Sequence, residues 1–143
     1  MKWQRIPVDD IQVVYKQAVG FHGHSGPYLA LGVVVGLYGL KKIGSTGYSG
    51  IEVVVRCRGN TPDTCFIDGL QVATGCTMGK RNLTWREGDG LSAEFRSGDK
   101  HIKFRVIDEY EEMAKNCPDY ESGLEIVEEI LNTSPEEIVE VIN

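Results

Sequence analysis

The chain has no excess of positive charge, no long apolar run and no pair of cysteines with two residues between them. Its 15 Lys and Arg stand against 21 Asp and Glu, which gives a formal net charge of −6. Non-specific binding to nucleic acids depends on Lys and Arg side chains that neutralise phosphates. We therefore expect no nucleic-acid partner.

A membrane-spanning segment is also missing from the sequence. The most apolar stretch runs from Tyr28 to Leu40 and is interrupted by glycines. It is shorter than the about 20 residues that a bilayer requires. The residues after Met1 lack the apolar core of a secretory signal. We expect a cytoplasmic protein without a membrane partner, whose cysteines are thiols or metal ligands.

The pattern along the chain predicts one α+β domain over residues 1–143. We expect helices at about 10–20, 27–43 and 62–75, strands at 50–57 and 82–86, and a hairpin formed by 91–96 and 101–107. From about residue 108 the chain is acidic and helical. Regular alternation of strands and helices is absent, so we predict an antiparallel or mixed sheet packed by helices.

Three glycines lie inside the most apolar predicted helix, at Gly32, Gly36 and Gly39. Each glycine in a helix interior costs about 1 kcal/mol relative to alanine. Their presence indicates that another backbone approaches this helix closely. A second helix, a sheet and a second subunit are all consistent with the pattern.

Two short stretches concentrate the residue types that bind transition metals. His22 and His24 lie two positions apart, and in an extended segment both side chains project to one side. Cys65 falls in the first turn of the third predicted helix, where the helix N-terminus favours a thiolate, and Cys76 follows the end of that helix. We predict a site for zinc or another divalent transition metal with ligands among these four residues.

The spacing of the two cysteines argues against a single ion bound by all four ligands. A straight helix would place Cys65 and Cys76 about 16 Å apart. A shorter helix, separate roles for the two thiols, or a site completed by a second subunit would each resolve this conflict. Asp63 and Asp68 flank Cys65 in the sequence and are candidates for orienting a ligand histidine, with a helix cap the favoured role for Asp63. Lys80 follows a glycine-rich turn that lacks the Walker spacing, and there it is a candidate for binding a small anion.

Together these residues resemble the E-subunit family of formylmethanofuran dehydrogenase, which includes stand-alone relatives. The resemblance covers residues 10–110. It rests on Phe21-His22-Gly23-His24, Pro27, Leu29-Ala30, Gly32, Cys65, Asp68, Leu70-Gln71, Thr74-Gly75-Cys76-Thr77, Gly79-Lys80 and Asn82-Leu83. In the family pattern a cysteine follows His-Gly-His, and this chain has Gly26 at that position. It also has no Cys-x-x-Cys pair with which to build the C-terminal zinc ribbon of many relatives.

The resemblance implies an α+β metal-binding accessory protein that forms a homodimer or joins the subunits of an enzyme complex. In methanogenic archaea that complex reduces carbon dioxide at a molybdenum or tungsten pterin centre, which belongs to other subunits. We therefore predict an accessory protein without the pterin chemistry. Two alternatives remain open: an enzyme that uses Cys65 or Cys76 as nucleophile with a histidine base, and a dimeric scaffold without metal.

Overall fold

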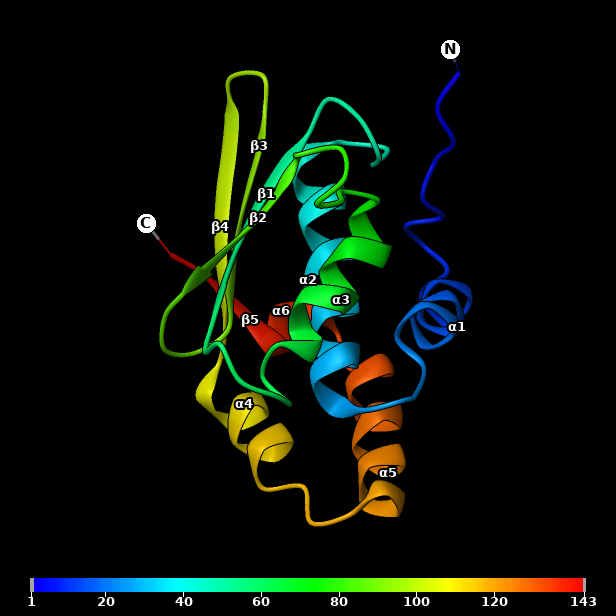
Figure 1. The fold of residues 1–143 in the computed structure, drawn as a ribbon, viewed down its shortest axis with the longest axis vertical. Coiled ribbons are helices and arrows are strands. Elements are labelled where there is room, and N and C mark those ends of the chain that lie inside the picture. The colour runs from blue at the N-terminus through cyan, green and yellow to red at the C-terminus, as the bar shows by residue number, and fades with distance from the viewer. Residues whose placement is uncertain (1, 143) are drawn as a thin grey trace.

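The computed structural model describes residues 2–142 and consists of a five-stranded sheet with helices packed against one face (Figure 1). The helices are α1 (Ile11–His22), α2 (Pro27–Ile43), α3 (Cys65–Thr74), α4 (Asp108–Lys115), α5 (Tyr120–Leu131) and α6 (Pro135–Ile138). The strands are β1 (Glu52–Cys57), β2 (Leu83–Glu87), β3 (Ser92–Ser97), β4 (Lys100–Val106) and β5 (Val139–Val141). This arrangement confirms the predicted α+β class.

The sheet is mixed, with the strand order β2-β1-β3-β4-β5. The β1 and β2 strands run parallel, with Val53 opposite Leu83, and every other neighbouring pair is antiparallel. Parallel neighbours require a crossover connection, and here α3 lies in that crossover. The chain therefore leaves the end of β1, passes through a loop and enters α3 at Cys65.

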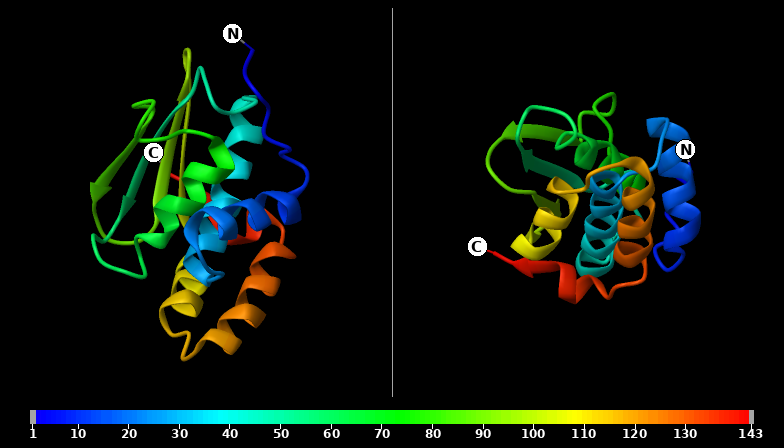
Figure 2. Two further views of the ribbon diagram at one scale, coloured as in Figure 1. Left: turned by 45° about the vertical axis from the view of Figure 1, so that its right-hand side comes forward. Right: turned by 90° about the horizontal axis from the view of Figure 1, so that it is seen from below.

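Helix α2 lies at the centre of the molecule. It contacts β3 and β4 on one side and α3 and α5 on others, and the right-hand view in Figure 2 shows it between the sheet and α5. Nearly all its residues are buried, and only Lys41 and Lys42 at its C-terminal end are exposed. This burial accords with its place as the most apolar helix that the sequence predicts. Within residues 2–142, no helix has the length and apolar character that crossing a membrane requires.

The glycines of α2 allow close packing within the chain itself. A Cβ on Gly32 would lie 2.9 Å from the Cα of Gly69 in α3, and one on Gly36 would lie 2.7 Å from the Cβ of Ala73. A Cβ on Gly39 would overlap the ring of Phe95 in β3. A helix and the sheet therefore supply the close approach that the sequence predicted.

Replacing Gly32 with alanine should lower the free energy of unfolding by about 1–3 kcal/mol, because overpacking forces the two helices apart. Gly20→Ala is the matched control, since Gly20 lies in α1 and a Cβ at that position would have no other atom within 4 Å. At Gly20 the higher helix propensity of alanine should raise the free energy of unfolding by about 0.5–1 kcal/mol. Urea denaturation of both variants measures the difference. Equal effects of the two substitutions would contradict the tight crossing.

Candidate metal centre

His22 and His24 flank the point where α1 ends. His22 is the last residue of the helix, and Gly23 ends it with a φ of 104° while its N–H donates to the Val19 carbonyl at 2.7 Å. The expectation that both histidines belong to one extended segment is therefore wrong. The left-handed turn at Gly23 nevertheless brings their rings to a centroid distance of 4.6 Å.

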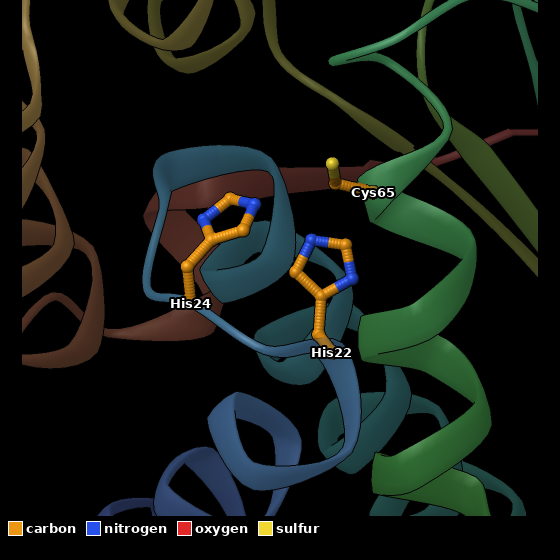
Figure 3. A group of neighbouring side chains, drawn as sticks. All are labelled: His22, His24 and Cys65. Atoms are coloured by element: carbon orange, nitrogen blue, oxygen red, sulfur yellow. The ribbon is translucent and has the colours of Figure 1, made fainter.

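Cys65 joins the two histidines from the start of α3. One donor atom from each of His22, His24 and Cys65 lies within 4.8 Å of the other two. Figure 3 shows the three side chains turned toward a common point, with the histidines on one side and the thiol on the other. Donor atoms about 2.0–2.3 Å from one tetrahedral zinc ion are about 3.3–3.8 Å apart, so side-chain rotations that bring the donors about 1 Å closer would complete the geometry.

The hydrogen bond of His22 leaves one ring nitrogen suited to a metal. Its Nδ1 lies 2.6 Å from Oδ2 of Asp68, and because an ionised carboxylate only accepts, Nδ1 carries the proton. Its Nε2 is buried and has no hydrogen-bond partner among residues 2–142. A buried nitrogen without a partner is costly unless a ligand occupies its lone pair, so this atom fits a metal. The contact agrees with the predicted orienting role of Asp68.

His24 presents Nε2 in the same way, because its Nδ1 donates to the Ser25 carbonyl at 3.0 Å.

Tyr15 of α1 holds the loop that carries His24. Its hydroxyl accepts a hydrogen bond from the Gly26 N–H at 3.1 Å and lies 2.6 Å from the Ser25 hydroxyl. The sequence places Tyr15 on the buried face of its helix, but no pattern shows which loop a phenol hydroxyl reaches. This supporting residue was therefore not predicted.

The structure does not bring Cys76 to this cluster. Cys65 begins α3, whereas Cys76 lies beyond its other end, where it is buried and its Sγ donates to the Ile51 carbonyl at 3.7 Å. Lys80 lies at the same end, and its Nζ donates to the Gly75 carbonyl and to Thr77 Oγ1. At this end Lys80 thus supplies hydrogen bonds to the turn that closes the helix.

Burial raises the pKa of the thiols at both ends of α3. It raises the pKa of Cys65, and the neighbouring Asp68 carboxylate raises that pKa further. The expectation of a low pKa at this helix N-terminus is therefore not met, because burial and the Asp68 carboxylate both raise the pKa. Burial also raises the pKa of Cys76 despite the charge of Lys80. A metal that binds Cys65 must therefore displace a proton.

Comparisons with known proteins identify the family. A protein of Archaeoglobus fulgidus named "Probable S-adenosyl-L-methionine-binding protein" is 38% identical over 76 residues, which cover 48% of this chain and 19% of that protein. The chain thus spans about a fifth of the length of this relative. The family model described as "FmdE, Molybdenum formylmethanofuran dehydrogenase operon" matches residues 21–140, which include His22, His24 and Cys65. The chain therefore belongs to the FmdE family.

Proposed function

We propose that this chain is a metal-binding accessory protein that holds one divalent transition metal ion at His22, His24 and Cys65. The observation that carries the proposal is the convergence of three donor atoms within 4.8 Å, together with the buried and unpartnered Nε2 of His22. In this proposal the chain does not itself carry molybdenum or tungsten pterin chemistry.

Zinc is the metal that best suits this donor set. Two imidazoles and one thiolate are among its usual ligands, and a carboxylate that orients a ligand histidine is a common part of zinc sites. Three protein ligands leave one of four tetrahedral positions open for water or a substrate. Cys76 lies outside the convergent group, so it has no part in the proposed site.

The proposal extends to partners. The description of the family model refers to the formylmethanofuran dehydrogenase operon, so we propose the subunits of an enzyme complex, or a second copy of the chain, as partners of a cytoplasmic protein. Met78 and Trp85 are large, exposed apolar side chains on a cleft of about 510 Å³ that His22 and Asp68 also line. Exposed apolar side chains that share one cleft support a contact surface beside the metal site.

Metal analysis of protein purified without chelator or affinity tag tests the site. We expect about one zinc per chain, lost in His22→Ala and in Cys65→Ala because each removes one of three ligands. His101→Ala and Cys76→Ala are matched controls that should retain the metal, since neither residue belongs to the cluster. A protein that takes up no metal even at micromolar zinc would rule out the proposal and favour a metal-free scaffold.

Asp68→Asn should weaken zinc binding by about 10–100-fold without removing it, because the amide orients His22 less firmly than the carboxylate does. Competition with a chelator of known affinity measures the change. Thermal unfolding of the metal-free variant provides the control, and it should show that the fold is retained. An unchanged zinc affinity would show that the Asp68 hydrogen bond does not support the site.

Alkylation of Cys65 distinguishes the metal site from a thiol enzyme. In metal-free protein the raised pKa leaves Cys65 mostly protonated at pH 7, so its reaction with iodoacetamide should be slow and should accelerate about tenfold per pH unit up to that pKa. Bound zinc should protect the residue. Peptide mass spectrometry assigns the modified cysteine. Rapid alkylation at neutral pH that zinc does not slow would support a nucleophilic cysteine instead.

A further inference from the structure

A pocket of about 270 Å³ adjoins the proposed metal site, and two of the three ligands, His24 and Cys65, line it. Its wall comes from the start of α2, the loop before α3, and the connection between α4 and α5. Most of the remaining lining is apolar and includes Pro27, Tyr28, Leu29, Pro62, Ala114 and Pro118. The volume lies just below the about 300–1,000 Å³ typical of pockets for drug-sized ligands, so its size suits a small molecule.

Gly26 leaves the boundary between this pocket and the ligand cluster open. It lines the pocket, and a Cβ built on it would lie 3.7 Å from Cε1 of His24. Its φ of −173° is extended backbone, so conformation does not restrict this position to glycine. A side chain here would project beside the ring of His24. In its absence the pocket has access to the point on which His22, His24 and Cys65 converge.

The charges around the pocket favour an uncharged body for the occupant. Lys115 and Asp119 are its charged lining residues, so their formal charges cancel. The Asp119 carboxylate already accepts a hydrogen bond from the Ser122 N–H at 2.7 Å, as the N-cap of α5. Burying an ionised group among the apolar side chains would be costly. The body of the ligand is therefore apolar, and its polar end faces the metal ligands.

We infer that this pocket holds a small organic thiol whose sulfur takes the coordination position left open beside Gly26. The inference rests on the proposed function, since the sulfur binds the same ion. A thiolate is a soft ligand that suits zinc, and an alkyl body suits the apolar wall. On binding, the S–H bond breaks, the sulfur–metal bond forms and the proton passes to solvent. No electron is transferred.

Equilibrium binding to zinc-loaded protein tests the inference with three matched probes: 1-butanethiol, 1-butanol and butyrate. Isothermal titration calorimetry should show the thiol binding at least about tenfold more tightly than either oxygen analogue, because the soft sulfur is the preferred donor. From ethanethiol to 1-butanethiol the affinity should rise about fourfold per methylene as the apolar wall is covered. In cobalt-substituted protein, the thiol should intensify the thiolate-to-metal charge-transfer absorption.

A pair of substitutions at Gly26 tests the position itself. Gly26→Cys supplies a thiolate from the chain, so it should bind zinc more tightly than the wild type and lose the binding of 1-butanethiol. Gly26→Ala adds the Cβ without a donor atom, and that Cβ would meet the His24 ring at an ordinary van der Waals distance. It should retain zinc within about threefold of the wild type, because no ligand is removed, and it should bind 1-butanethiol more weakly because the added methyl group narrows the open boundary.

The outcomes separate the two proposals. Zinc-loaded wild-type protein that binds the thiol no better than butanol, or Gly26→Cys protein that still binds it, would overturn the pocket assignment and leave the metal site intact. An affinity independent of alkyl length would show that the thiol binds the metal outside the pocket, which also overturns the assignment. Wild-type protein that takes up no zinc would overturn the proposed function and this inference with it.

Discussion

The absence of side chains where α2 crosses α3 is the constraint on which the rest of the structure depends. Gly32 and Gly69 face each other at the crossing, where a Cβ on either would lie 2.9 Å from the Cα of the other. Close approach increases dispersion contacts between the helices and their neighbours. Because α2 is buried against the sheet, this contact fixes α3 relative to the sheet. The position of Cys65 at the start of α3 follows from it.

The residues of the proposed metal site come from two helix ends that are distant in sequence. The C-terminal end of α1 supplies His22, the turn after it supplies His24, and the N-terminal end of α3 supplies Cys65. The hydrogen bond from His22 to Asp68 joins the same two helices. Each helix end is set locally, because Gly23 ends α1 and the crossover loop leads directly into α3. The donor set exists only because the helices pack against each other.

The sequence predicted the elements better than it predicted the site. The bounds of α2 follow from Pro27 at its start and Gly44 after its end, which are local signals. The cluster of His22, His24 and Cys65 could be proposed from residue types and from the family resemblance. The spacing of Cys65 and Cys76 along one helix already argued against one ion bound by both. The reach of Tyr15 and the raised pKa of Cys65 could not be predicted. Each depends on tertiary packing, which decides distance and desolvation and leaves no periodic pattern in the sequence.

The hydrogen bond between His22 and Asp68 has a consequence for the folding of the chain. The two residues belong to helices separated by α2 and β1 in the sequence, so an ion held at His22 and Cys65 would act as a cross-link between remote segments. A site made of such segments does not exist in the unfolded chain, and part of the binding free energy of the metal is then free energy of folding. Metal supply would in that case set how much of the protein is folded as well as how much is loaded.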